Sequence, residues 1–160
     1  MTSSGQWYGA VWNDYAEMRN VPEANTFEET EDSHNVKLAG RCVRDIGDDT
    51  MALSSDRMQP GCKIISDTFG FNIGETDNCK TPIAVSGRAL VYIYEGREAA
   101  RQHIGQPVCS GPDGTVSIMT DEEYRDKGYC CVGTISAIPE YQTWGSGNIQ
   151  VDGRIWIYIK

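Results

Sequence analysis

Residues 85–94 read VSGRALVYIY, and residues 151–160 read VDGRIWIYIK. Aligned without a gap, the two segments share a valine, a Gly-Arg pair, a tyrosine and an isoleucine, which is five of ten positions. Both alternate aliphatic residues with aromatic or charged ones, and this two-residue period is typical of a β-strand. The chain therefore carries one strand-forming segment twice, 66 residues apart.

A second pair of segments repeats at nearly the same spacing. Residues 40–56 (GRCVRDIGDDTMALSSD) match residues 105–121 (GQPVCSGPDGTVSIMTD) at five of seventeen positions, 65 residues apart. Each reads as a strand, an Asp- and Gly-containing turn and a strand, which is the pattern of a β-hairpin. Two blocks with almost one period indicate two copies of a β-unit, at about 36–95 and 101–160. We expect a mainly β domain over 36–160, in which the duplicated units pack as one barrel or sandwich.

The last strand predicts two different faces. Ile155, Ile157 and Ile159 point one way and are expected in the core. The opposite face carries four residues: Arg154, Trp156, Tyr158 and Lys160. An aromatic face with charged ends fits either a half-solvated rim or a surface that meets another subunit, and the sequence leaves both interpretations open.

One short helix is predicted, over residues 121–127. In TDEEYRDKG (120–128), Thr120 is placed to cap it, Glu123 completes a capping box and Gly128 can end it. Residues 1–35 match neither repeat and are expected to form an aromatic and acidic arm anchored on the body. The stretch between Pro22 and Ser33 holds acidic but no basic residues, which favours an exposed loop.

Composition limits the function classes. A net charge of −9 disfavours binding to nucleic acid or to an anionic membrane. No apolar run approaches the roughly 18 residues of a membrane span. No cofactor is expected, and the cysteines and histidines lack the short spacings of metal ligands. We expect free structural thiols, with disulfides as the alternative, and place the adjacent Cys130 and Cys131 in a buried strand with one side chain facing each way.

An ordered set of motifs runs through the whole chain. DYAE (14–17) is followed by the acidic stretch, GRCV and GDDTM (within 40–51), ISDTFGFNIG (65–74), GTISAIPEY (133–141) and GNIQVDGRIWIYIK (147–160). Together they resemble the autoproteolytic C-terminal intramolecular chaperone domain of tailed-phage appendage and tail-fibre proteins, a family grouped with the glutamic peptidases. The resemblance implies a homotrimer that helps an upstream fibre segment of the same polypeptide to fold and is then cut off by self-cleavage. It also implies a virion protein made in the cytoplasm of a bacterial host.

Carried over residue by residue, the resemblance puts the scissile bond between Asn13 and Asp14, where the family usually has a serine before the cut. It makes Asp14 and Glu17 the catalytic carboxylates. One would act as base or nucleophile toward the Asn13 carbonyl, and the other, with a raised pKa, would protonate the leaving nitrogen. Their spacing is expected to place both acids on one side of a helical or tight turn. In the alternative interpretation these acids only cap or form salt bridges, with Arg19 nearby.

Two other functions remain open. Many fibre tips bind host surface glycans, and aromatic side chains can stack on sugars. Trp144, in the glycine-containing YQTWGSGN (141–148), is the main candidate for such contacts, and the other ligand or interface candidates are Trp12, Trp156 and Tyr158. The third possibility is a β-module without activity that stays attached to its fibre. A diffusing hydrolase is disfavoured, because the sequence has no GxSxG motif and no phosphate loop.

Overall fold

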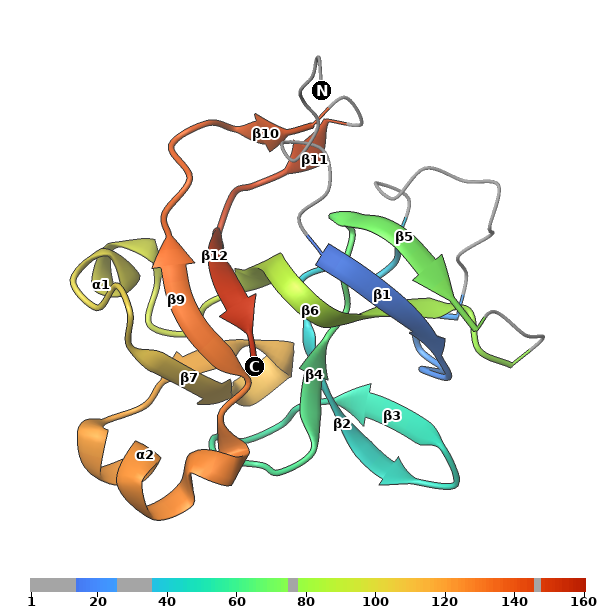
Figure 1. Ribbon diagram of the computed structural model, residues 1–160, viewed down its shortest axis with the longest axis horizontal. Helices are drawn as coiled ribbons and strands as arrows, with labels where there is room; N and C mark the ends of the chain where they lie inside the picture. The colour runs from blue at the N-terminus through green and yellow to red at the C-terminus, as the bar shows by residue number, and fades with distance from the viewer. Residues whose placement is uncertain (1–13, 26–35, 75–77, 146–147) are drawn as a thin grey trace.

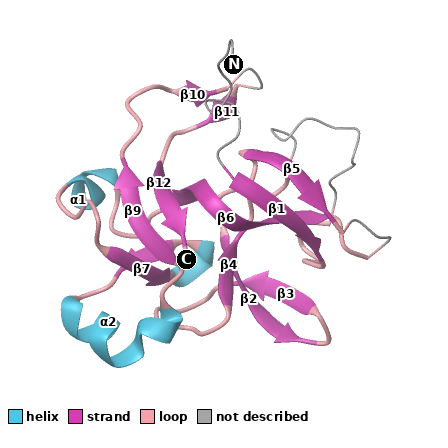
Figure 2. Cartoon of the chain, viewed as in Figure 1, coloured by secondary structure: helices cyan, strands magenta, loops and turns pink. Residues whose placement is uncertain are grey.

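The computed structural model describes residues 14–25, 36–74, 78–145 and 148–160 (Figure 1). Over these residues the chain is mainly β, as predicted, with two short α-helices (Figure 2). The strands are β1 (Asp14–Arg19), β2 (Cys42–Gly47), β3 (Thr50–Leu53), β4 (Cys62–Ile64), β5 (Phe69–Ile73), β6 (Thr81–Tyr92), β7 (Pro107–Ser110), β8 (Val116–Ile118), β9 (Gly133–Ala137), β10 (Thr143–Trp144), β11 (Ile149–Gln150) and β12 (Arg154–Ile159).

The predicted helix is confirmed as α2 (Asp121–Lys127). Thr120 accepts a hydrogen bond from the Glu123 backbone N–H at 3.0 Å, and the Glu123 carboxylate accepts one from the Thr120 N–H at 2.9 Å, which is the expected capping box. A second helix that the sequence pattern did not predict, α1 (Arg97–Arg101), follows β6.

The strands form two main sheets that face each other. A seven-stranded sheet has the order β5-β1-β6-β12-β9-β7-β8, and a three-stranded sheet has the order β3-β2-β4. A buried cluster joins Cys42 and Ile64 of the small sheet to Val91, Ile155 and Ile157 of the large one. The core therefore lies between two sheets, as in a β-sandwich. The ribbon of β10 and β11 lies at one end of β12 (Figure 1).

The two predicted hairpins have the same register. In β2–β3, Val43 lies opposite Leu53, and in β7–β8 the equivalent Val108 lies opposite Ile118. Their third strands also correspond, because Cys42 pairs with Ile64 of β4 as Pro107 pairs with Thr134 of β9. The turn residues Asp48 and Asp113 share a left-handed backbone, with φ of 52° and 55°. This agreement in register is independent of the sequence identities that predicted the duplication.

The two copies meet where β6 and β12 pair antiparallel. Leu90 lies opposite Trp156, and these are equivalent positions of the two repeats. Consequently Arg88 of one copy lies opposite Tyr158 of the other, while Tyr92 lies opposite Arg154. A pairing that maps onto itself in this way has pseudo-two-fold symmetry, with its axis at the Leu90–Trp156 pair.

Two local expectations in the loops and the N-terminal segment differ from the structure. Residues 14–19 of the expected arm form β1, which lies between β5 and β6 in the large sheet. Cys130 and Cys131 do not lie in a strand, because Cys130 ends the 3-10 helix η4 (Gly128–Cys130). The expectation of free thiols is not among those that differ, since all six thiols are free.

The aromatic and charged face of β12 is buried over most of its length, so it forms neither the half-solvated rim nor the open surface that the sequence allowed. Trp156 is only 2% exposed, because Leu90, Ile149 and Val151 pack around it. Arg154 is 3% exposed. The residues of this face that reach solvent are Tyr158, which is 55% exposed, and Lys160.

Candidate active site

The residues of DYAE lie in β1, and their side chains alternate between its two faces. Asp14, Ala16 and Met18 are buried, while Tyr15 and Glu17 are partly exposed. β1 runs parallel to β5 and antiparallel to β6, so that the Asp14 backbone lies between Phe69 and Gly87. Because a strand changes face at every residue, positions three apart point in opposite directions. The expected turn that would bring both acids together is therefore wrong.

The Asp14 carboxyl group is held by two buried hydroxyls. Ser66 Oγ donates to Oδ2 at 2.6 Å, and Thr68 Oγ1 donates to Oδ1 at 2.7 Å. The Thr68 backbone N–H donates to Ser66 Oγ at 3.1 Å and so fixes that hydroxyl. Ser66 and Thr68 are each 1% exposed, and Asp14 is 8% exposed. The carboxyl group is thus desolvated but keeps a hydrogen bond at each oxygen.

This environment raises the pKa of Asp14 to about 7. Burial is the main cause, because it penalises the charged form. The Ser66 and Thr68 hydrogen bonds act in the opposite direction, and the charge of Asp67 raises the pKa further. Near neutral pH the group is divided between acid and carboxylate, which is the condition under which a side chain can either donate or accept a proton.

A buried ion pair anchors the segment that holds Asp14. Arg154 Nη2 and Nη1 donate to the two oxygens of Asp67 at 2.5 and 3.0 Å. The same guanidinium donates to the carbonyls of Leu90 and Gln150, at 3.0 and 2.9 Å. Asp67 lies between Ser66 and Thr68, so this clamp from β12 fixes the two hydroxyls that contact Asp14.

Glu17, the second predicted carboxylate, takes no part in this cluster. Its side chain is 44% exposed and forms an ion pair with Arg19 at 3.6 Å. The alternative of a salt-bridged acid therefore describes Glu17, whereas Asp14 is buried among hydroxyls. Asn13 and Trp12 lie outside the described residues.

Of the predicted ligand and interface residues that the structure describes, Trp144 and Trp156 contact each other, and Tyr158 is exposed. Trp144 in β10 is partly buried, and its ring packs edge-on against Trp156 with centroids 5.5 Å apart and planes at 78°. Trp156 is part of the core, and its indole N–H donates to the Tyr141 hydroxyl at 3.3 Å. Tyr158 lies further along β12 and is exposed. Of these side chains, only Tyr158 presents most of its surface to solvent.

The sequence pattern missed four members of the cluster as site residues: Ser66, Asp67, Thr68 and Arg154. A signal for three of them was present, because three consecutive polar residues interrupt the apolar run in KIISDTFGF (63–71). Buried polar groups of this kind need hydrogen-bond partners, which predicts a network but does not name the partner.

Comparison with known proteins finds no family model that matches the sequence, no similar curated protein and no similar solved structure. Within the described ranges, no helix is long and apolar enough to cross a membrane. The same residues contain no group of three or more histidine, cysteine, aspartate or glutamate side chains placed to hold a metal ion.

Proposed function

We propose that this chain is the trimerising intramolecular chaperone and cap domain of a tailed-phage fibre or appendage protein, and that it cleaves itself between Asn13 and Asp14. The observation that supports self-cleavage is the buried Asp14 carboxyl, which belongs to the residue directly after that bond and titrates near neutral pH. A surface aspartate would be fully ionised there and could not donate a proton.

In this proposal Asp14 is the general acid. Glu17 of another protomer is the general base: it takes one proton from a water molecule, and the resulting hydroxide adds to the carbonyl carbon of Asn13. The bond from that carbon to the Asp14 nitrogen then breaks, and the Asp14 carboxyl group supplies the proton that the leaving nitrogen needs. Ser66 and Thr68 then stabilise the carboxylate that remains, since both donate to it. Asp67 and Arg154 are positioning residues, because they hold the segment that carries these hydroxyls.

Glu17 can contribute only from a neighbouring chain, since it lies on the face of β1 opposite to Asp14. The proposal therefore assigns Glu17 to the bond of another protomer in the trimer. This assignment makes cleavage depend on assembly, so that a chain would be cut only after the three chains are in register.

The test is native mass spectrometry of the chain extended upstream by a fibre segment. We expect a trimer, and from the wild type a released domain that begins at Asp14. Asp14→Asn is expected to abolish release, and Asp126→Asn, an exposed acid on α2, serves as the matched control that cleaves normally. The cleavage rate should fall as the pH rises above about 7, where Asp14 loses its proton.

Co-expression of Asp14→Asn and Glu17→Gln chains tests the role of Glu17. If Glu17 acts across the interface, the Asp14→Asn chain supplies Glu17 to a neighbouring Glu17→Gln chain. Mixed trimers should then release the domain from the Glu17→Gln chain, which keeps Asp14. Release by Glu17→Gln homotrimers would contradict a catalytic role for Glu17. Intact trimers of every variant, the wild type included, would identify a cap that stays attached, and a monomer would contradict the chaperone function.

For the alternative function, a glycan-binding tip, we propose a surface cavity as the binding site. A cavity of about 400 Å³ is lined by Glu140, Tyr141, Gln142, Gln150 and Asp152, together with Arg97. Amides and carboxylates around an exposed tyrosine are suitable for hydrogen bonds to sugar hydroxyls. Because Tyr141 contacts Trp156, sugar binding there should change tryptophan fluorescence, and Gln150→Ala should reduce the change.

A further inference from the structure

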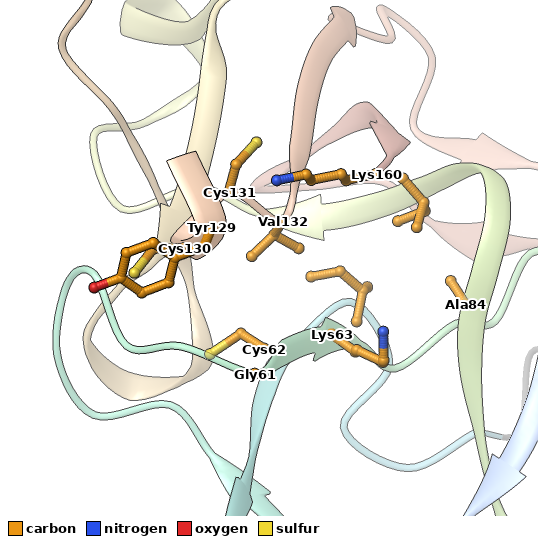
Figure 3. A pocket seen from close by; sticks show the side chains of 11 residues that line it. Gly61, Cys62, Lys63, Ala84, Tyr129, Cys130, Cys131, Val132 and Lys160 are labelled. Carbon is orange, nitrogen blue, oxygen red and sulfur yellow. The ribbon is translucent and has the colours of Figure 1, made fainter. Parts of the chain in front are cut away.

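A second cavity, separate from Asp14, contains three cysteines. It has a volume of about 300 Å³ and lies between β4, the η4 turn and the end of β12 (Figure 3). Cys62, Cys130 and Cys131 line it together with Lys63 and Lys160. Ile64, Ala84, Val132 and Ile159 add an apolar wall. The hollow thus combines thiols, positive charge and apolar surface.

A fourth cysteine lies behind Cys62. On the paired strands β2 and β4, Cys42 is opposite Ile64 and Arg44 is opposite Cys62, so Cys42 and Cys62 are diagonal neighbours on one face. Cys42 is completely buried in the core, whereas Cys62 packs against the same core and is partly exposed to the cavity. Only Cys62 of this pair can meet a molecule from solvent.

The surroundings of Cys62 favour its thiolate. Its interaction with the Cys42 thiol lowers its pKa, and the Ser110 hydroxyl and the charge of Arg44 act in the same direction. Burial and the charge of Asp45 oppose them. Correspondingly, the interaction with Cys62 and burial raise the pKa of Cys42, so that Cys42 remains the protonated partner.

All three cavity cysteines donate to a backbone carbonyl, Cys62 to that of Gln59 at 3.4 Å, and the two others differ from Cys62 in burial or in the direction of the pKa shift. Cys130 is 3% exposed, and its thiol donates to the Met58 carbonyl at 3.3 Å. Cys131 donates to the Gly133 carbonyl at 3.2 Å, and burial raises its pKa. A thiol that is buried or has a raised pKa reacts slowly, because the thiolate is the nucleophile.

We propose that Cys62 is a modification site for small disulfides of the glutathione class, with Cys42 as its positioning residue. The Cys62 thiolate attacks one sulfur of the disulfide, a new bond joins Cys62 to one glutathione, and the second leaves as a thiolate that takes up the proton lost by Cys62. Cys62 is oxidised and the leaving sulfur is reduced, so no other reactant is needed. Lys63 and Lys160 are placed to bind the carboxylates of the tripeptide.

The product is a mixed disulfide rather than a Cys42–Cys62 bridge. Diagonal neighbours on antiparallel strands have Cα atoms roughly 7–8 Å apart, whereas a disulfide needs a separation below about 7 Å. Closing a bridge would therefore require the two strands to move. Modification of Cys62 and self-cleavage at Asp14 would be separate properties, because none of the residues around Asp14 lines the cavity.

The experiment treats the native protein with oxidised glutathione at neutral pH and follows the adducts by intact mass and peptide mapping. We expect one glutathione per chain, on Cys62. Cys62→Ser is expected to remove the adduct, and Cys131→Ser, a matched change in the same cavity, to leave it unchanged. An adduct on Cys130 or Cys131, an internal Cys42–Cys62 disulfide, or no reaction of the folded protein would overturn the proposal.

The role of Cys42 is tested by the pH profile of alkylation at Cys62. In Cys42→Ala the midpoint is expected to move to higher pH, and the rate at pH 7 to fall roughly three- to tenfold. Circular dichroism establishes that this core variant is folded, and Lys63→Gln supplies a surface variant that should slow glutathionylation without moving the alkylation midpoint. An unchanged midpoint in folded Cys42→Ala would show that Cys42 does not position Cys62.

Discussion

Asp67 and Arg154 are 87 residues apart in the sequence and form a buried two-point ion pair, with side chains 7% and 3% exposed. Removing one partner of such a pair leaves an uncompensated charge in the core. Asp67→Asn is therefore expected to lower the free energy of unfolding by about 3–5 kcal/mol. Urea denaturation measures the change. Glu98→Gln, at an exposed ion pair with Arg101, should leave the denaturation midpoint unchanged, and equal effects of the two variants would contradict this assignment.

The titration of Asp14 should lower the stability of the protein as the pH rises from about 4 to about 7. Asp14 has its pKa raised from 3.8 to about 7 by folding, so between these values the folded state binds more protons than the unfolded state. The cost of burying the charge is absent below pH 4 and complete above pH 7. It amounts to up to about 4 kcal/mol, since one pKa unit corresponds to about 1.4 kcal/mol.

Asp14→Asn is the variant that isolates this effect. An amide has no charge to bury and can still bond to the Ser66 and Thr68 hydroxyls, so the fall in stability between pH 4 and 7 should be reduced. Urea denaturation at several pH values measures it. A variant as pH-dependent as the wild type in that window would show that another group is responsible.

Gly133→Ala is expected to be among the most damaging single-methyl additions. A Cβ atom at Gly133 would overlap the carbonyl oxygen of Tyr158, a backbone atom that cannot rotate away. We expect a loss of roughly 3 kcal/mol or more, or failure to fold, because β9 and β12 would have to separate. Gly128→Ala is the control, since its nearest neighbour would be the Tyr124 ring at 3.8 Å. Thermal denaturation compares the two variants, and equal melting temperatures would contradict the prediction.

Trp156→Ala and Tyr158→Ala separate the two parts of the β12 face. Trp156 is buried, so its truncation should cost about 3–5 kcal/mol in the free energy of unfolding. Tyr158 is 55% exposed, and its truncation should change stability by less than about 1 kcal/mol. Denaturant titration of both variants makes the comparison. A trimer that uses this face would be weakened by Tyr158→Ala although the chain remains stable.

The duplication, the hairpins and α2 could be predicted because their signals are local. Alternating residues, turn residues with a left-handed backbone such as Asp48 and Asp113, and the Thr120–Glu123 capping box each act within a few positions. The prediction for residues 14–19, which form β1, was wrong. The alternation of Asp14, Ala16 and Met18 with Tyr15 and Glu17 was visible, but the spacing of the acids was interpreted as a turn.

The cluster around Asp14 could not be predicted in the same way. Ser66 and Thr68 are 52 and 54 residues from Asp14, and Arg154 lies near the other end of the chain. Their meeting depends on the order β5-β1-β6-β12, and a single sequence does not specify which strands become neighbours. The core position of Trp156 has the same origin, because β10 and β11 cover a face that the pattern alone left open.

The pseudo-two-fold pairing at Leu90 and Trp156 has an evolutionary consequence. A contact that maps onto itself is the contact of a symmetric dimer, so an ancestral single unit could have assembled from two separate chains in this way. In such a dimer each of the two chains would have contained a position equivalent to Asp67. Strand register places the equivalent of Asp67 at Ala137 in the second copy. Arg88, the equivalent of Arg154, donates to the neighbouring Ser136 hydroxyl at 3.5 Å, and its guanidinium carbon lies 4.5 Å from the Trp156 ring centroid. After a gene fusion the two halves could diverge, and in this chain the first copy has an acid at this position whereas the second has alanine.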